Sequence, residues 1–169
     1  MNKQEQDKFL DLLQPNAGII HKVIRLYADD PEDQRDLYQE IVCQAWGAWQ
    51  RFEGNSKFST WLYRVALNTA LTFDKRRRRN QSDLPEPETL TPPPSVAYEA
   101  RELLTWAMTK LEEVDRMVIL LHLEGYEHAE IASITATNTN NIAVKLHRIK
   151  KRLTEILAPY RDGFSGNMG

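Results

Sequence analysis

Apolar residues recur at helical spacing through the first half of the chain, and this pattern predicts four helices. A short helix around Phe9 is expected first. A second should begin near Pro15, because proline is tolerated in the first turn of a helix. A third should run from Pro31 to Arg51, and a fourth should begin near Ser59 or Thr60, either of which could act as its N-cap.

Four further helical segments follow, at Tyr98–Leu111, Val114–Leu123, Glu127–Ile134 and Asn138–Leu157. The Val114–Leu123 segment is apolar almost all round, so it should form the buried centre of its domain and end at Gly125. The expected fold class is therefore all-α, with two small helical domains.

The segment between the two sets of helices, residues 80–95, carries five of the eight prolines and shows no helical periodicity. Proline fixes φ and removes a backbone donor, so this stretch should be an extended, semi-rigid linker that spans up to about 50 Å. We therefore expect domains at residues 1–79 and 96–158, followed by a disordered tail at residues 159–169.

Charge is segregated along a chain whose hydrophobic fraction of 41% and charged fraction of 27% are typical of a globular protein. The formal net charge is only −2, so any nucleic-acid function must depend on local charge. Residues 75–79 form an unbroken cationic run and residues 145–152 hold five further cations, whereas acidic side chains gather at residues 29–36 and 83–88. The two cationic runs are therefore the candidates for contact with a polyanion.

Several function classes find no support in the sequence. No apolar run is long enough to cross a bilayer, the N-terminus does not resemble a secretory signal, and the single Cys43 cannot form an internal disulfide. We therefore expect a cytoplasmic protein. No glycine-rich phosphate loop or activated nucleophile is present, and His122 and His128 are separated by a helix break at Gly125. We expect no enzymatic activity, catalytic residue, metal or cofactor.

The last two helices form the pattern of a helix-turn-helix, in which a short helix and a tight turn precede a longer cationic helix. One stripe of the long helix is apolar and should pack against the preceding helices. The opposite stripe is polar and cationic, as expected of a helix that enters the major groove of duplex DNA. The residues assigned to duplex DNA are Asn138, Thr139, Asn140, Asn141, Val144, Lys145, Arg148, Lys151 and Arg152.

Each part of this stripe has an expected contact. Asn140 and Asn141 could bond to base edges, especially adenine, Val144 could meet a thymine methyl, and the cations at residues 145–152 could meet phosphates. The start of the helix, capped by Asn138, also favours a phosphate. The alternative is a solvated face, because cations near a helix C-terminus complement its dipole. The short preceding helix, the paired asparagines and the apolar Val144 on a wet face favour DNA.

The helix after the turn at residues 52–58 carries a polar stripe that leads into the first cationic run. Bases freed from a duplex stack on aromatic rings and bond to amides, so this surface suits a melted DNA strand. The residues assigned to it are Asn55, Ser56, Lys57, Phe58, Arg64, Asn68, Lys75, Arg76 and Arg77. The alternative, which we expect for most of the aromatic side chains, is that they belong to the core. For residues 76–79 the alternative is that the arginines are simply the solvated end of the helix. This alternative is disfavoured, because four adjacent like charges repel unless an anion meets them.

The predicted third helix has a second strip opposite its core face, formed by Gln39, Cys43, Trp46 and Gln50 beside Val42. Either a protein partner or another helix of the same domain could cover this strip, and the sequence leaves both possibilities open.

Two sets of motifs resemble the extracytoplasmic-function (ECF) sigma factors of bacterial RNA polymerase. The first set is DLYQE at residues 36–40, AW at 45–46 and FSTWLYRVALN at 58–68. The second set is EG at residues 124–125, EIA at 130–132 and IAVKLHRIKKRL at 142–153. The two sets resemble the two conserved domains of the family in the family's order, so the resemblance covers nearly the whole chain.

The resemblance implies a transcription initiation factor that binds core RNA polymerase, directs it to promoters and helps to open the DNA. The loop at residues 53–58 with Arg64 and Asn68 would hold the non-template strand of the minus-ten element, and the helix at residues 138–152 would read the minus-thirty-five element as a duplex. Members of the family are often held inactive by an anti-sigma factor, which is a further candidate partner. The residues that would contact polymerase are Asp36, Gln39, Glu40, Cys43 and Trp46.

The rival interpretation is an autonomous helix-turn-helix regulator that does not join polymerase. It would leave Arg64, Asn68 and residues 76–79 without a role. Such a regulator would also usually dimerise to match two half-sites, whereas this sequence shows no heptad seam.

The chain departs from the family pattern around the helix-turn-helix. Ala136 stands where glycine is usual, and if that position needs a positive φ, alanine costs about 1 kcal/mol there. Glu127 and Glu112 stand where a serine cap and a proline are usual. Asn140 and Asn141 stand where glycine and threonine are frequent, so a relative's promoter preference cannot be transferred to this chain.

Overall fold

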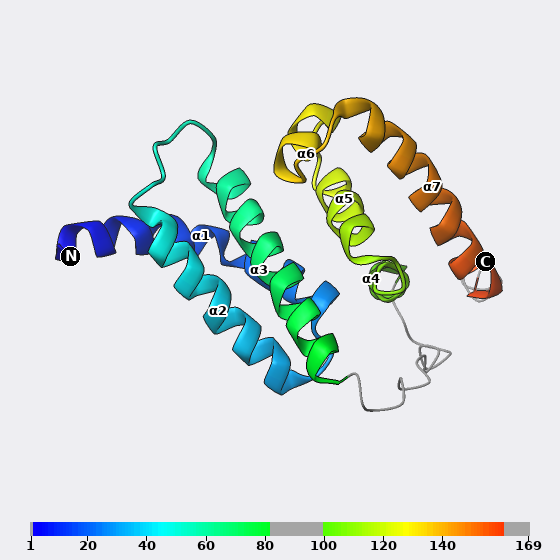
Figure 1. Ribbon diagram of the computed structural model, residues 1–169, viewed down its shortest axis with the longest axis horizontal. Helices are drawn as coiled ribbons and strands as arrows, with labels where there is room; N and C mark the ends of the chain where they lie inside the picture. Colours follow the sequence, from blue (N-terminus) through cyan, green and yellow to red (C-terminus); the bar gives the residue numbers. More distant parts are fainter. Residues whose placement is uncertain (1, 82–99, 161–169) are drawn as a thin grey trace, which may run out of the picture. The chain divides into compact units, whose positions relative to one another are not determined.

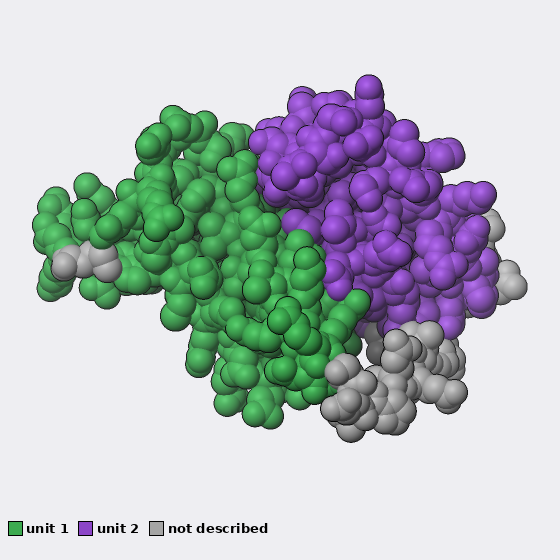
Figure 2. Space-filling view, in the orientation of Figure 1, with its two compact units in different colours: residues 1–83 green, residues 84–169 purple. Residues whose placement is uncertain are grey.

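The computed structural model describes residues 2–81 and 100–160, and the chain divides into two compact units, residues 1–83 and 84–169 (Figure 2). All regular structure in the described ranges is helical, so the all-α fold class is confirmed. Within these ranges, no helix combines the length and the apolar character that a bilayer crossing requires. Most of the predicted linker and of the predicted tail lies outside the described residues.

The first unit is built from three long helices, α1 (Lys3–Tyr27), α2 (Pro31–Trp49) and α3 (Phe58–Asn80), each of which packs against the other two (Figure 1). Asp30 caps α2 by accepting a hydrogen bond from the backbone N–H of Glu32 at 3.1 Å. All three helices contribute fully buried side chains to one core, among them Ile20, Val23, Leu37, Ile41, Leu62 and Leu67.

The prediction of two separate helices before residue 28 is wrong, because α1 is one helix with Pro15 in its interior. Phe9 on one side of the proline and Ile20 on the other are both buried in the core of the unit, so tertiary packing holds the chain helical across the proline. The Asn16 side chain also donates to the Leu12 carbonyl at 2.8 Å, within the turn that contains the proline.

The start of α3 also differs from the prediction. The helix begins at Phe58 with Lys57 in the cap position and no side-chain cap bond, so neither Ser59 nor Thr60 is the N-cap. Phe58 is buried against other aromatic rings, and this burial extends the helix to a residue that has no capping side chain in front of it. The preceding helix α2 ends at Trp49, two residues before the predicted end.

The second unit consists of α4 (Ala100–Met108), α5 (Glu113–Leu123), α6 (His128–Ile134) and α7 (Thr139–Leu157), with a short 3-10 turn at Ala158–Tyr160. The predicted apolar stripe of α7 is the buried one, and α7 packs against the other three helices of the unit (Figure 1). Its buried side chains are Ile142, Leu146, Ile149 and Leu153. The middle of α5 is buried as predicted, whereas Val114 and Leu123 near its ends are 41% and 52% exposed.

The turn between α6 and α7 has a left-handed residue at its centre. Ala136 adopts a φ of 55°, and the next residue, Thr137, donates its backbone N–H to the Ala132 carbonyl at 2.9 Å. This bond from the second residue beyond the cap back to the last turn is the closing bond of a Schellman motif. The position where the family usually has glycine does therefore need a positive φ here. At the start of α6, the backbone N–H of Glu127 donates to the side chain of Glu130 at 3.0 Å.

Candidate nucleic-acid and polymerase interfaces

The face of α7 that lies opposite its buried stripe is open to solvent. Asn140, Val144 and Arg148 are all exposed, and Val144 is 56% exposed despite its apolar side chain. Because the core contacts of α7 are on the other side, no described residue of this unit covers these three side chains. The remaining residues assigned to duplex DNA are also exposed, apart from the half-buried Lys145: Asn138, Thr139, Asn141, Lys151 and Arg152.

The cations on this face differ in how they are held. The Lys145 ammonium lies 3.5 Å from the carboxylate of Asp115 on α5, and the Arg152 guanidinium lies 3.5 Å from Glu155. Arg148 and Lys151 are exposed and have no ion-pair partner within the described ranges. Arg148 and Lys151 are therefore the cations on this face that can bind an anion without first breaking an ion pair within the described ranges.

The start of α7 is organised by side chains of the turn. Asn138 is the N-cap, as predicted, and its Oδ1 accepts a hydrogen bond from the backbone N–H of Asn141 at 2.9 Å. The Nδ2 of Asn141 in turn donates to the Oγ1 of Thr137 at 3.1 Å. Two of the asparagines assigned to DNA are therefore already engaged within the protein, each in a different way.

In the first unit, the polar stripe of α3 and the loop before it form a second candidate surface. Asn68 and Lys75 are exposed and Arg64 is half-buried, all on the same helix. The loop that precedes α3 turns at Gly54, which has a φ of 73°, and it exposes Asn55, Ser56 and Lys57. These side chains are placed along the path that a single DNA strand would follow from the loop to α3.

Phe58 does not belong to this surface, so its assignment to the melted strand is corrected. It is 9% exposed, and its ring lies 5.3 Å from that of Trp61 and 6.1 Å from that of Trp49, measured between centroids. The alternative stated for the aromatics, that they are core, therefore holds for Phe58. Phe52 and Trp61 are half-buried, with ring centroids 5.1 Å apart.

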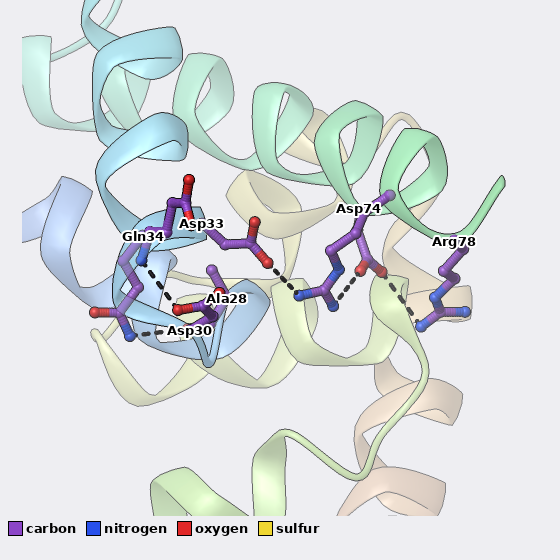
Figure 3. Close-up of polar contacts among 8 residues, drawn as sticks. Ala28, Asp30, Asp33, Gln34, Asp74 and Arg78 are labelled. Carbon is purple, nitrogen blue, oxygen red and sulfur yellow. Dashed lines mark hydrogen bonds and ion pairs between the residues drawn. The ribbon is translucent and has the colours of Figure 1, made fainter. Parts of the chain in front are cut away.

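The arginine run at the end of α3 is paired with carboxylates of its own unit. Asp74 is fully buried and lies 3.1 Å from Arg77 and 3.2 Å from Arg78, and Arg77 also lies 3.4 Å from Asp33 on α2 (Figure 3). Arg76 lies 2.7 Å from Glu40. These carboxylates of the protein itself offset the mutual repulsion of the arginines, so the repulsion does not require an anion from outside the chain.

Sequence reasoning missed these carboxylates. Asp74 precedes Arg77 and Arg78 by three and four residues, the spacing at which helical side chains meet, so the sequence held a signal for it. Asp33 lies on another helix, and no local pattern could have paired it with Arg77.

The strip assigned to polymerase on α2 is covered in one part and open in another. Asp36, Gln39 and Cys43 are exposed, and Glu40 is half-buried in its contact with Arg76. The Trp46 ring is half-buried against Phe9 of α1, with 5.1 Å between the ring centroids. A helix of the same domain therefore covers the Trp46 end of the strip and leaves the Gln39 end accessible.

His122 and His128 lie on either side of Gly125. The rings of His122 and His128 lie 6.3 Å apart, and no group of three or more histidine, cysteine or acidic side chains in the described ranges could hold a metal ion. Partial burial, with the nearby charge of Lys150 and the His128 ring, lowers the pKa of His122 below its usual value of 6.5.

Comparison with known proteins gives the same division of the chain. Residues 12–80 match the family model of sigma-70 region 2, and residues 101–153 match that of sigma-70 region 4. The ECF RNA polymerase sigma-E factor of Escherichia coli K12 is 29% identical over 147 residues, which cover 75% of each chain. The ECF RNA polymerase sigma factor SigG of Mycobacterium tuberculosis is 34% identical over 167 residues, which cover 79% of this chain and 44% of SigG.

Two solved structures share the fold. The sigma factor RpoE of Bartonella quintana, solved in complex with the anti-sigma factor NepR, superposes with a TM-score of 0.69 at 22% identity, covering 90% of this chain and 98% of that one. CnrH, solved with the cytosolic domain of CnrY, superposes with a TM-score of 0.66 at 22% identity, covering 91% of this chain and 90% of that one.

Proposed function

This chain belongs to the ECF group of the sigma-70 family, and we propose that its two units divide promoter recognition between a melted strand and a duplex. As an ECF sigma factor it binds core RNA polymerase and directs promoter-specific transcription initiation. The match of residues 12–80 to sigma-70 region 2 argues against the rival interpretation, because an autonomous helix-turn-helix regulator has no need of that domain.

In this proposal α7 reads the minus-thirty-five element in the major groove. The observation that carries the proposal is the outward stripe of Asn140, Val144 and Arg148, on the side of α7 opposite its buried residues. Amides and an apolar side chain near the start of the helix suit base edges, and cations further along suit phosphates. The domain that carries α7 is assigned to residues 96–158.

The first domain, assigned to residues 1–79, holds the non-template strand of the minus-ten element during melting. The exposed Asn68 and Lys75 on α3 and the exposed loop side chains Asn55 to Lys57 support this role. Amide groups can bond to bases that have left the duplex, and the cations can follow the strand backbone. Residues 80–95 would be the linker between the two DNA contacts.

Core polymerase docks on the open part of α2. Asp36, Gln39 and Cys43 present side chains to solvent there, and Glu40 borders them. The chain would act in the cytoplasm and would carry no catalytic activity of its own. Because both structural neighbours were solved with an anti-sigma factor or the cytosolic domain of a partner, we include an anti-sigma factor among the partners to be tested.

The test uses the full chain reconstituted with core polymerase on a promoter selected from a genomic fragment library by run-off transcription. Replacing Arg148 by alanine should weaken closed-complex binding and reduce the salt dependence by about one unit of slope for one lost phosphate contact. Asn68→Ala should leave this binding unchanged and slow open-complex formation, detected by permanganate reactivity of unpaired thymines. Unchanged binding and salt slope in Arg148→Ala would remove α7 from the duplex interface, and normal melting in Asn68→Ala would refute the strand assignment.

A further inference from the structure

The three asparagines at the start of α7 do different things with their side chains. The Oδ1 of Asn138 accepts the backbone N–H of Asn141 at 2.9 Å, so this amide is used to cap the helix. The Nδ2 of Asn141 donates to Oγ1 of Thr137 at 3.1 Å. Asn140 is exposed and has no side-chain partner within the described ranges. Asn141 is thus the one of the three whose exposed carboxamide is held in place without being used as the cap.

The residue that holds Asn141 is itself fixed by the turn. Thr137 is half-buried, and its backbone N–H donates to the Ala132 carbonyl at 2.9 Å, which ties it to the end of α6. The preceding Ala136 has a φ of 55°, the conformation that this closing bond requires. The backbone of the turn therefore positions the hydroxyl of Thr137. The hydrogen bond to this hydroxyl in turn orients the side chain of Asn141.

The groups left on Asn141 define a hydrogen-bonding pattern. A carboxamide has one oxygen acceptor and two N–H donors, and Thr137 takes one of the donors. One acceptor and one donor remain, side by side on an exposed side chain. In the major groove, adenine presents a donor at N6 beside an acceptor at N7, whereas guanine presents two acceptors, cytosine a donor, and thymine an acceptor and a methyl group.

We propose that Thr137 is a positioning residue that presents the carboxamide of Asn141 to adenine in the minus-thirty-five duplex. This inference rests on the proposed role of α7 as the helix that reads that duplex. A good bidentate contact discriminates against a wrong base by about fivefold to a hundredfold. Holding the side chain before binding avoids the loss of its rotational freedom, so removing the anchor should lower the discrimination by about two- to tenfold.

A purely structural role of the Thr137–Asn141 bond makes a different prediction. If the bond only stabilises the start of α7, its loss should weaken binding to every duplex equally. If it positions Asn141, its loss should change the preference at one base pair and leave the preferences at the others as they were. The ratio of affinities for two bases at one position is therefore the decisive quantity.

The experiment uses holoenzyme made from the full chain and core polymerase, with duplexes randomised across the minus-thirty-five region and sequenced after binding. Asn141→Ala should lose an adenine preference at one position. Thr137→Val and Thr137→Ala, which both lack the hydroxyl, should lower that preference about two- to tenfold, and Thr137→Ser should retain it. In the Asn141→Ala background, adding Thr137→Val should not change the base preference any further. In the control background Asn140→Ala, adding Thr137→Val should lower the adenine preference as much as it does in the wild type.

A second measurement uses the wild-type protein. Placing 7-deazaadenine, which lacks the N7 acceptor, at the position that depends on Asn141 should reduce affinity in the wild type and have no effect in Asn141→Ala. Circular dichroism of each variant checks that its total helical content equals that of the wild type.

The inference is overturned if both variants without the hydroxyl keep the wild-type preference, or if they weaken all duplexes equally. It is also overturned if Asn141→Ala changes no position. In that last case the effect of Arg148→Ala separates the two proposals. A weaker complex leaves α7 as the reading helix and removes only the role of Thr137, whereas an unchanged complex removes both.

Discussion

The guanidinium of Arg76 lies 2.7 Å from the carboxylate of Glu40, and this ion pair joins the C-terminal end of α3 to the outer face of α2. The guanidinium carbon of Arg76 also lies 5.7 Å from the ring centre of Phe73. Glu40 belongs to the surface proposed for polymerase and Arg76 to the run proposed for DNA. One ion pair therefore links the two surfaces, and each of its two residues can be replaced separately.

Replacing either partner of this pair should have little effect on stability. The Arg76 side chain is 53% exposed and the Glu40 side chain 27%, and an exposed ion pair contributes about 0–1 kcal/mol to the free energy of unfolding. Glu40→Gln should lower the affinity of the chain for core polymerase, measured by competition with the wild-type chain. Arg76→Gln should instead slow open-complex formation. Urea unfolding with both functional assays checks this. The same defect in both variants would mean that the pair acts as a unit and that the two surfaces are not separate.

The buried carboxylate of Asp74 should contribute much more than the ion pair on the surface. It is 0% exposed and meets both Arg77 and Arg78, whose charges lose their nearest carboxylate if it is removed. Asp74→Ala should lower the free energy of unfolding of the first unit by about 1–3 kcal/mol. Chemical unfolding followed by tryptophan fluorescence measures this loss.

Asp33→Ala is the matched control for Asp74→Ala. The Asp33 side chain is 29% exposed and lies 3.4 Å from Arg77, so its removal should cost less than about 1 kcal/mol. Equal losses in the two variants would show that burial of Asp74 adds nothing to the network.

The reach of sequence reasoning differs between the two units. In α7, a buried stripe of Ile142, Leu146, Ile149 and Leu153 follows from helical period alone, and the exposed opposite face follows with it. The cap at Asn138 was also predictable, because the capping residue and the helix that it caps are neighbours in sequence.

The errors lie where tertiary packing decides the outcome. Pro15 favours a helix start locally, but burial of residues on both sides makes α1 continuous. Phe58 lies in a loop-like sequence, yet it is buried in an aromatic cluster. The partners of Arg76 and Arg77 on α2 are 36 and 44 residues away, a separation over which no periodic pattern carries information.

Ala136→Gly should stabilise the second unit. Alanine at a φ of 55° carries a steric cost that glycine avoids, although glycine also loses more chain entropy on folding. The expected net gain is about 0.5–1 kcal/mol, or a few degrees in the midpoint of thermal unfolding. Differential scanning calorimetry of the full chain measures it.

Gly125→Ala is the mirror control for this substitution. Gly125 has a φ of 89°, and an added Cβ would meet no atom within 4 Å, so any loss of stability there comes from the backbone alone. It should destabilise the unit by about 1–2 kcal/mol. A stabilising Gly125→Ala, or a destabilising Ala136→Gly, would contradict the assigned backbone conformations.

His122 should make the second unit less stable at mildly acidic pH. Partial burial, the charge of Lys150 and the His128 ring lower its pKa in the folded chain below the unfolded value of 6.5. Between the folded pKa and 6.5, the unfolded state binds more protons than the folded state, so stability falls as the pH falls through this window. The free energy of unfolding, measured from pH 8 to pH 5, should depend less steeply on pH in His122→Gln than in the wild type.

Lys150→Gln separates the electrostatic cause from burial. Removing this charge should raise the pKa of His122 part of the way towards 6.5 and should remove part, but not all, of the pH dependence, because burial is the larger cause. The ring proton resonances of His122, followed by NMR titration of the full chain, give the pKa in the folded state directly. A value above 6.5 in the wild type would mean that folding favours the protonated ring, and the stability would then rise rather than fall on mild acidification.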